Sequence, residues 1–326
     1  MVVRIGTWNL ENLFGPGDAA GPRTDADYQA KLSALARVIV AMGPDVLAVQ
    51  EVGDVDALTD LADRAGGGWH LETAEPDRRG IRVGFMSRLP LTEVGQVRAF
   101  PAGLRPIQVN DTTTPATEMG RAALAVRVQV GGRAIDLISC HLKSKLLTFP
   151  DGRFSTRDEG ERARFGAYAL NRRAAEAVTV RAAATELLTA GDTRDRDGTT
   201  DADGASVMVL GDLNDEAQAA TTQILHGPPG SEIGTDGFDR PDQGDRQRLW
   251  NLAARIPQAQ RFTRIYRGRP ELIDHILVSQ ALVALVPDGA VTTDGAGPVP
   301  SIADDPGLRR DAPGSDHRPV IATITL

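Results

Sequence analysis

The stretch that most constrains this chain covers residues 207–215 and reads VMVLGDLND. Its first residues are apolar and include two β-branched valines, which predicts a buried strand. We expect Gly211 to end that strand, because glycine lets the backbone turn tightly. Asp212 and Asn214 follow at a spacing of two, so their side chains would project together from the strand end. Such a pair could hold a water beside a divalent metal, although the same residues are also common in ordinary turns.

Composition limits the class of protein. The chain has 326 residues, of which 41% are hydrophobic, enough to bury a substantial core. Its net charge of −8 argues against a protein that coats nucleic acid or an anionic membrane by charge alone, but it leaves room for a local basic groove. Cys140 is the single cysteine, so no intrachain disulfide can form and nothing indicates an oxidising compartment.

Targeting signals are not evident in the sequence. The first predicted strand begins at Val2, without the basic region and apolar segment of a secretory signal. No apolar run approaches the length of a membrane span. We therefore expect a cytoplasmic protein that has no membrane span, and no obligate protein partner is evident.

Apolar periodicity predicts both strands and helices along the whole chain. Strands are expected at residues 2–8, 45–52, 82–86, 122–130, 133–141, 207–210, 261–266, 272–278 and 320–325. Helices are expected at residues 28–42, 55–64 and 158–189, and a short one after Asp215. Two polar segments rich in Gly, Asp, Pro or Thr, near 190–205 and 287–314, are expected to be mobile loops.

Polar side chains recur at the ends of the predicted apolar strands. They are Asn9, Glu11, Glu51, His141, Asp212, Asn214, Asp274, Asp316 and His317. A single site built from them would need nearly the whole chain, so we predict one domain over residues 1–326. Carboxylate and amide oxygens suit Mg²⁺ or Mn²⁺, and histidine can transfer protons or stabilise phosphoryl charge near neutral pH. The sequence has no Cys/His cluster for zinc, no phosphate-binding Gly-x-x-x-x-Gly-Lys loop and no Gly-x-Ser-x-Gly elbow.

Six short motifs occur in order along the chain. They are WNLEN at 8–12, QE at 50–51, SCHL at 139–142, GDLN at 211–214, IDHI at 273–276 and SDHRP at 315–319. Together they resemble the endonuclease/exonuclease/phosphatase superfamily, the fold of deoxyribonuclease I and exonuclease III. In style they are closest to bacterial extracellular-nuclease-like members. The resemblance implies an α+β fold, a four-layer α/β sandwich in which helices flank two central, mostly antiparallel sheets and the site lies at one edge.

The resemblance also implies a metal site and a water site. Glu51 would be the principal ligand of Mg²⁺ or Mn²⁺, with Asn9 beside it and Asp316 closing the metal site. Asp212 and Asn214 would position the attacking water and the scissile phosphate.

The remaining implied roles concern two histidines and an arginine. His317 would be the catalytic histidine, oriented by Asp274, whose carboxylate would raise the pKa of the imidazole and fix its tautomer. His141 would be a second histidine that stabilises the pentavalent phosphorus, but no acidic partner for it is evident. Arg121 resembles an arginine that contacts phosphate in the deoxyribonuclease I branch. The segment that begins at Arg79 is basic, whereas related nucleases often carry an acidic or aromatic residue there.

Several assignments stay open on the sequence alone. Glu11 is either an outer ligand of the metal or a surface residue. Tyr266 and Arg264 either border a substrate groove or serve structural packing. His275 lies inside an apolar strand and is expected to be structural. The arginines of the predicted helix at 158–189 are expected to form a solvated face with nearby glutamates.

The function implied is a divalent-metal-dependent phosphodiester hydrolase, first of all a nuclease that cleaves DNA or RNA by in-line attack of an activated water. The alternative is a phosphatase or phosphodiesterase that acts on a phosphoinositide, a phospholipid or a small phosphodiester. A binding module without catalysis is disfavoured, because the residues of the chemistry are all present. Lys143 and Lys145 are two of only three lysines and are expected to offer mobile ammonium groups to a polyanionic substrate. Their alternative role is to face solvent and pair with a nearby carboxylate.

Overall fold

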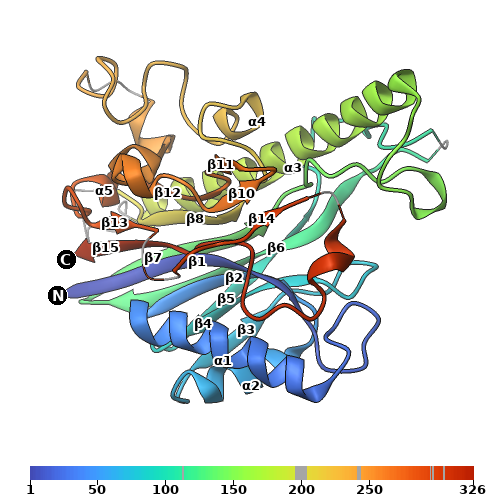
Figure 1. Ribbon diagram of the computed structural model, residues 1–326. Helices are drawn as coiled ribbons and strands as arrows, with labels where there is room; N and C mark the ends of the chain where they lie inside the picture. Colours follow the sequence, from blue (N-terminus) through green and yellow to red (C-terminus); the bar gives the residue numbers. More distant parts are fainter. Residues whose placement is uncertain (112–113, 195–203, 241–243, 294, 296, 304) are drawn as a thin grey trace.

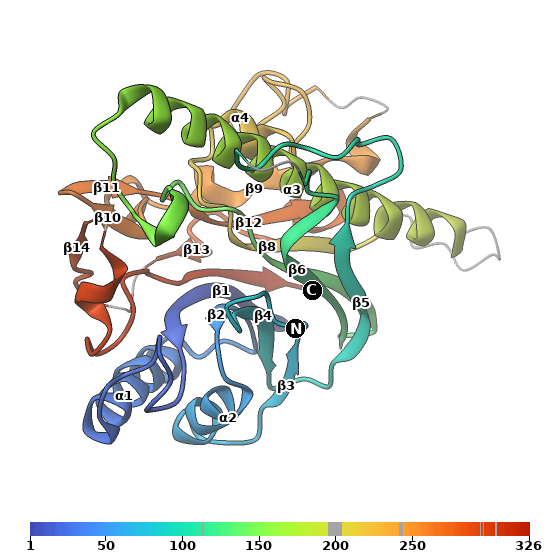
Figure 2. The ribbon, with the colours of Figure 1, turned by 90° about the vertical axis from the view of Figure 1, so that its right-hand side faces the viewer.

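The computed structural model describes residues 1–326 apart from 112, 113, 195–203, 241–243, 294, 296 and 304. Two six-stranded sheets pack face to face, with helices on the outer side of each (Figures 1 and 2). The predicted α+β four-layer sandwich is therefore confirmed.

The first sheet has the strand order β13-β15-β1-β2-β4-β3. Its strands are β1 (Val2–Leu13), β2 (Val46–Val52), β3 (His70–Thr73), β4 (Arg82–Ser87), β13 (Val291–Thr292) and β15 (Val320–Thr325). β1 and β2 run parallel, and the other neighbouring pairs are antiparallel. Because β1 pairs with β15, the two ends of the chain lie side by side (Figure 1).

The second sheet has the order β5-β6-β7-β8-β12-β9. Its strands are β5 (Thr92–Ala99), β6 (Glu118–Val130), β7 (Arg133–His141), β8 (Val207–Asp212), β9 (Leu249–Asn251) and β12 (Asp274–Ser279). Only β7 and β8 run parallel among its described neighbours. A small third sheet has the order β11-β10-β14, from β10 (Arg264–Tyr266), β11 (Arg269–Glu271) and β14 (Ser301–Ile302).

Helices cover the outer faces of both large sheets. α1 (Asp25–Met42) and α2 (Val55–Arg64) lie against the first sheet, while α3 (Glu159–Arg194) and the short α4 (Ala220–Gln223) lie on the side of the second (Figures 1 and 2). The N-terminus of α1 is capped by Thr24, whose side chain accepts a hydrogen bond from the Asp27 amide. The remaining helical segments are α5 (Gln280–Val283) and the 3₁₀ turns η1 (Pro150–Gly152), η3 (Asp245–Gln247), η4 (Leu252–Arg255), η5 (Gln258–Gln260) and η6 (Pro306–Arg309).

Apolar residues fill the space between each pair of layers. The core between the two sheets includes Ile5 and Phe85 from the first sheet and Leu124 and Leu210 from the second. A second core joins the first sheet to α1 and α2, and a third joins the second sheet to α3. A strand buried on both faces cannot alternate apolar and polar residues, which explains the nearly continuous apolar runs in β2 and β8.

The residues that face the space between the sheets become polar at one end of the strands. Alternate positions along these strands are Ile5, Thr7 and Asn9 in β1; Ala48 and Gln50 in β2; Leu137, Ser139 and His141 in β7; Met208, Leu210 and Asp212 in β8; and Val278, Ile276 and Asp274 in β12. Hydrogen bonds cross between the sheets at this end, from Asn9 to Asp212 and from Gln50 to Ser139. The alternation thus builds a polar edge on an apolar core.

Gly211 does not end its strand, contrary to the sequence prediction. It lies within β8 and pairs with Cys140 on one side and His275 on the other. A Cβ atom at this position would lie 1.9 Å from the Cys140 carbonyl oxygen, so glycine is required by the close approach of β7. The turn comes later, at Asn214, whose φ is 53°.

Other differences concern segments with little apolar patterning. β3, β5 and β9 were not predicted, and the segment near 287–314 contains β13, β14 and η6 instead of one loop. Of the loop expected near 190–205, α3 takes up the part as far as Arg194, and residues 195–203 lie outside the described residues. None of the described helices is both long enough and apolar enough to span a bilayer.

Candidate active site

Three candidate residues form one row across the second sheet. In the register of β7, β8 and β12, His141 pairs with Asp212, and Asp212 pairs with Asp274. Their exposed fractions are only 4%, 1% and 0%, respectively. Since neighbouring strands lie about 4.8 Å apart, strand register alone brings a histidine and two carboxylates together at the polar edge.

His317 joins this row from the loop that precedes β15. Its Nδ1 lies 2.7 Å from Asp274 Oδ2. Trp8 Nε1 donates to the His317 carbonyl oxygen at 2.9 Å, and the His317 amide donates to Ser315 Oγ at 3.0 Å. Ser315 Oγ itself donates to the Asn9 carbonyl at 2.6 Å, which ties the loop to β1. These bonds fix the imidazole, and Nε2 is the ring nitrogen left for a substrate.

The charge state of His317 follows from its neighbours. Burial opposes a charge on the ring, but the carboxylates of Asp274, Asp316 and Asp212 outweigh burial and raise the pKa of His317 to about 10. The ring therefore carries protons on both nitrogens at neutral pH. Ligand atoms of Asp212, Asp274 and His317 lie within 4.8 Å of one another, and His317 Nδ1 shares a hydrogen bond with Asp274 Oδ2. We interpret this cluster as a proton-holding group, because a proton and a metal compete for the same imidazole nitrogen.

Asp212 is the central carboxylate of the site. Its Oδ2 accepts a hydrogen bond from Asn9 Nδ2 at 3.0 Å, and its Oδ1 accepts one from the Asn214 amide at 2.9 Å. Burial and the nearby charge of Asp274 raise the pKa of Asp212 to about 7, although His317 acts in the opposite direction. A carboxylate with this pKa can exchange a proton near neutral pH, which suits a group that accepts a proton from water.

His141 lies on the other side of Asp212 from Asp274 in the strand order. Its Nε2 is 3.5 Å from Asp212 Oδ2 and 4.0 Å from Glu51 Oε1. Burial, and then the nearby positive charge of Arg121 above all, lowers the pKa of His141 well below its ordinary value. The ring is neutral at physiological pH, so its contacts with carboxylates are not ion pairs. Among the described residues, no hydrogen-bond partner reaches its buried Nδ1.

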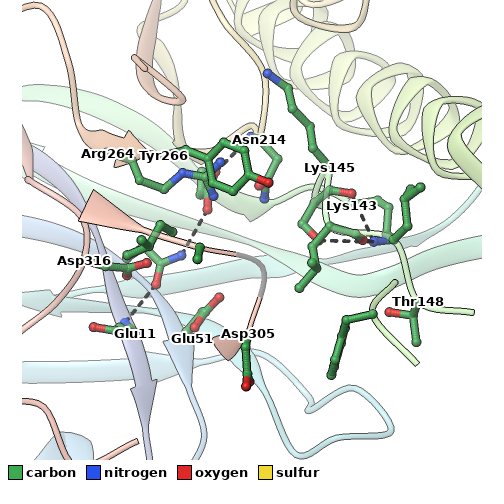
Figure 3. A pocket seen from close by; sticks show the side chains of 18 of the residues that line it. Glu11, Glu51, Lys143, Lys145, Thr148, Asn214, Arg264, Tyr266, Asp305 and Asp316 are labelled. Atoms are coloured by element: carbon green, nitrogen blue, oxygen red, sulfur yellow. Dashed lines mark hydrogen bonds between the residues drawn. The ribbon is translucent and has the colours of Figure 1, made fainter. Parts of the chain in front are cut away.

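The residues assigned to the metal lie at the edge of the first sheet. Glu51 Oε2 accepts a hydrogen bond from the Asn12 amide at 2.9 Å, and Asn9 Oδ1 accepts one from the Glu11 amide at the same distance. Glu51 and Asp316 lie on the same side of the cleft in Figure 3. Two carboxylates and an amide oxygen form a hard donor set, which fits Mg²⁺ or Mn²⁺ that keeps several waters.

Glu11 is held by an arginine of the loop that contains η6. Arg309 donates to both of its carboxylate oxygens, from Nε at 2.6 Å and from Nη2 at 2.8 Å. Burial and the charge of Asp316 raise the pKa of Glu11, whereas the bond from Arg309 lowers it. Glu11 lines the cleft but has both oxygens engaged, which argues against a direct ligand role.

The backbone is strained where the site is built. Six described residues other than glycine have positive φ, and five of them line the same cleft: Glu11, Asn12, Glu51, Asn214 and Arg267. Such conformations cost about 1–3 kcal/mol each and persist only where the surrounding structure fixes them. Their concentration here indicates that the polar edge is shaped for a task other than stability.

The cleft has a volume of about 860 Å³ and two differently charged sides. The acidic edge consists of Glu11, Glu51 and Asp316, which lie together in Figure 3. Facing it are Lys143 and Lys145. We use the term basic wall for Arg79, Arg121, Lys143 and Arg172, which all line the cleft.

The two lysines are less free than expected. Lys143 Nζ donates to three oxygens of the loop that follows it, at 2.8–3.1 Å, so the expectation of a mobile ammonium group is wrong for this residue. Burial, followed by the charges of Arg121 and Arg172, lowers the pKa of Lys143 to about 8. Lys145 Nζ lies 3.1 Å from Asp215 Oδ1, in agreement with the alternative role for the lysines.

Sequence comparison places the chain among known proteins. The model of the Endonuclease/Exonuclease/phosphatase family matches residues 6–317. The chain belongs to this family. Members of the family are hydrolases that act on phosphoesters, typically with a divalent metal. A search of curated proteins gave no match.

Solved structures with the same family fold show the same overall arrangement. Truncated TDP2 from Caenorhabditis elegans is 16% identical, with a TM-score of 0.53 over 100% of this chain and 98% of that one. An endonuclease/exonuclease/phosphatase family protein from Bacteroides thetaiotaomicron is 13% identical, with a TM-score of 0.52 over 99% and 95%. A mannosyl-6-phosphatase from the same species is 13% identical, with a TM-score of 0.50 over 98% of both chains. At these identities the likeness concerns the fold alone.

Family motifs did not point to several residues that shape the cleft. Glu176 of α3 is buried and accepts hydrogen bonds from the Gly120 amide at 2.9 Å and the Lys143 amide at 2.6 Å. Arg173 is also buried, and its Nε lies 3.1 Å from Asp215 Oδ2. The expectation of a solvated face is therefore wrong for Arg173, whereas Arg162 and Arg172 pair with the helix glutamates Glu159 and Glu176 as expected. No local pattern reveals such contacts, because they join residues 30 or more positions apart.

The structure also locates Tyr266, Arg264 and His275, which the sequence analysis discussed without assigning to the site. Tyr266 and Arg264 line the cleft, and Arg264 Nη2 lies 2.8 Å from Glu271 Oε2. His275 is buried, with its Nε2 2.9 Å from the Asp215 carbonyl oxygen and its Nδ1 3.1 Å from Asn251 Nδ2. The structural assignment of His275 agrees with these contacts.

Proposed function

We propose that the chain is a divalent-metal-dependent phosphodiesterase whose first substrate class is nucleic acid. The observation that carries this proposal is the convergence of His317, Asp274 and Asp212 beside the Glu51 and Asn9 edge, at one end of a cleft with a basic wall. These groups can hold an attacking water, a phosphoryl group and a hard cation within one site.

Each residue of this chain has a defined part in the proposed hydrolysis. Asp212 orients the attacking water and accepts its proton, and Asn214 and Asn9 keep the carboxylate in position. His317 donates a hydrogen bond from Nε2 to a phosphoryl oxygen, while Asp274 keeps Nδ1 protonated. His141 donates from its neutral ring to the same phosphoryl group as charge develops.

The metal belongs to the acidic edge. Glu51, Asn9 and Asp316 would hold Mg²⁺ or Mn²⁺, which when bound polarises the phosphoryl group and stabilises its developing negative charge. Arg121 would contact phosphate on the other side of the cleft, and Lys143 and Lys145 would add positive charge there. The cytoplasmic location and the single-domain organisation stay predictions from the sequence.

A small phosphodiester or phosphomonoester is the second candidate substrate. Glu11, Glu271 and Asp305 also line the cleft, and their carboxylates disfavour a long polyanion on that side. This distribution allows a substrate that occupies only the hydrolytic centre and the basic wall.

A substrate panel tests the proposal. Single- and double-stranded DNA, RNA, bis(p-nitrophenyl) phosphate and sugar phosphates are incubated with Mg²⁺, with Mn²⁺ and with EDTA, and the H317A protein serves as the blank. We expect metal-dependent release of product from at least one phosphodiester substrate, and no release of product in the presence of EDTA. Equal rates for the wild-type and H317A proteins on every substrate would contradict the proposal.

A further inference from the structure

The turn after β3 is built around one carboxylate. Asp77 Oδ1 accepts hydrogen bonds from the amides of Arg79 at 2.7 Å and Ile81 at 3.0 Å. Backbone bonds close the same turn, from the Asp77 amide to the Ile81 carbonyl at 2.8 Å and from the Gly80 amide to the Asp77 carbonyl at 3.0 Å. The turn is therefore rigid, and it presents the side chain of Arg79 to the cleft.

The other oxygen of the same carboxylate positions Arg121. Asp77 Oδ2 lies 3.0 Å from Arg121 Nε, and both side chains are largely buried. This contact uses one edge of the guanidinium, and within the described part of the chain no hydrogen bond occupies its Nη groups. A guanidinium held in this way is oriented in advance for an anion.

Arg79 has no counter-ion among the residues that the structure describes. Its side chain is exposed and lines the cleft, and no ion pair or side-chain hydrogen bond engages it among the described residues. Arg79, Arg121 and Lys143 all line the cleft together with His141. Asp77 is the carboxylate that pairs within this group, so positive charge is in excess on this side of the centre.

Lys143 does not supply the missing contact for an anion. Its ammonium group already donates to three oxygens of its own loop. It adds positive potential but has little capacity for a further direct bond. Arg79 and the Nη groups of Arg121 are therefore the donors left for an anion.

We propose that Arg79 and Arg121 form a second phosphate subsite, beside the hydrolytic centre on the His141 side. The inference rests on the proposed phosphodiesterase function, and it adds that the substrate carries a second phosphate next to the one that is hydrolysed. Arg121 already resembles a phosphate-contacting arginine, whereas the assignment of Arg79 and of the Asp77 turn is new. Asp77 binds both the Arg79 backbone amide and the Arg121 side chain, and both arginines line the cleft. Two guanidinium groups favour an anion that can accept several hydrogen bonds, as phosphate does.

Chromogenic esters that differ by one phosphate test the subsite. The substrates are the p-nitrophenyl ester of thymidine 5′-phosphate with and without a 3′-phosphate, and the p-nitrophenyl ester of thymidine 3′-phosphate with and without a 5′-phosphate. The two pairs show on which side of the scissile group the second phosphate lies. For one pair, we expect the added phosphate to lower KM by about tenfold in the wild-type protein, with a smaller effect on kcat.

Variants of neighbouring arginines separate a subsite from a general charge effect. R79Q should bring the ratio of kcat/KM between the paired esters close to one. R79K should restore part of the preference for the ester that carries the added phosphate. R78Q is the matched control, because Arg78 is exposed and adjacent but does not line the cleft. It should keep the wild-type ratio. For a single-stranded oligonucleotide, R79Q should also reduce the slope of log affinity against log salt by about 0.7.

The outcomes distinguish the two proposals. If no ester and no bis(p-nitrophenyl) phosphate is hydrolysed with either metal, the proposed function fails. If the esters are hydrolysed but the added phosphate changes KM in neither pair, or R79Q keeps the wild-type ratio, the subsite is refuted while the function stands. An equal loss of the ratio in R78Q and R79Q would also refute it, because the effect would then be general surface charge.

Discussion

Two histidines of the same cleft are equally buried, but their surroundings shift their pKa values in opposite directions. His317 lies against Asp274, with further carboxylates nearby, and its pKa is raised to about 10 in spite of burial. His141 has an exposed fraction of only 4%, the same as His317, but it faces Arg121, Lys143 and Arg79, and its pKa is lowered well below the ordinary value. Burial alone would make both rings neutral.

At equal burial, neighbouring charges make the difference: carboxylates reverse the effect of burial at His317, whereas the cations near His141 act in the same direction as burial. The carboxylates around His317 stabilise an imidazolium, which can bind and polarise a phosphoryl oxygen. Burial, aided by the cations around it, keeps the His141 ring neutral, and those cations leave positive charge available for an anion. Both conditions favour a substrate that brings negative charge to the site.

The largest expected effect comes from removing the charged histidine. H317A should reduce phosphodiester hydrolysis by about 10²–10⁴-fold, since it removes the donor to the phosphoryl oxygen. Steady-state rates with Mg²⁺ measure the loss. H70A is the control, because His70 is an exposed histidine of β3 and does not line the cleft. A comparable loss in H70A, or none in H317A, would contradict the role of His317.

A smaller but still large effect is expected at the acidic edge. E51Q should remove most metal-dependent activity, because the carboxylate would no longer add negative charge beside Asn9 and Asp316. E11Q should lose less, since both oxygens of Glu11 are held by Arg309. Rates measured across a Mg²⁺ titration compare the two variants. If E11Q is the more damaging change, the metal ligands have been assigned wrongly.

The next prediction concerns pH and the support that Asp274 gives to His317. If the imidazolium is the active form, activity falls as pH rises through its pKa, which is about 10 in the wild-type protein. D274N removes the nearest carboxylate, so burial prevails, the pKa falls and the loss of activity moves to lower pH. We also expect a rate decrease of about 100-fold at the optimum. Rate–pH profiles of both proteins test this, and an unchanged alkaline limb would show that the pair does not control the charge.

The smallest effect is expected for Lys145, the exposed lysine that faces the acidic edge. K145A breaks a partly exposed contact with Asp215, and such pairs typically contribute less than about 1 kcal/mol. K143A removes three hydrogen bonds to the loop after β7 and should change oligonucleotide cleavage more. Parallel KM measurements for the two variants test the order. A larger effect of K145A would restore the interpretation of Lys145 as a direct phosphate contact.

Much of the fold could be predicted because its strands are buried on both faces. The apolar runs of β2, β7, β8 and β12 were recognised, with bounds that differ by a few residues. β5 was missed because its residues are mostly exposed and its sequence, TEVGQVRA, lacks a clear apolar face. Gly211 was misassigned because its role depends on the close approach of β7, which only the assembled sheet reveals.

The site was predictable to the extent that strand ends and motifs define it. Asp212, Asp274 and His317 were expected together; their ligand atoms lie within 4.8 Å of one another, and His317 is hydrogen-bonded to Asp274. Charge state was less accessible to sequence reasoning. The low pKa of His141 and the pairing of Lys145 depend on contacts between segments far apart in the sequence, which no local pattern records.

The protonation states of the two histidines at neutral pH test the account most directly. Nitrogen NMR of ¹⁵N-histidine-labelled protein at pH 7.5, assigned with the H317A and H141A variants, reports the proton on each ring nitrogen. We predict that both nitrogens of His317 are protonated and that one nitrogen of His141 is not. Two neutral rings, or two rings that titrate together near pH 6.5, would contradict the separation of charge on which the proposed site depends.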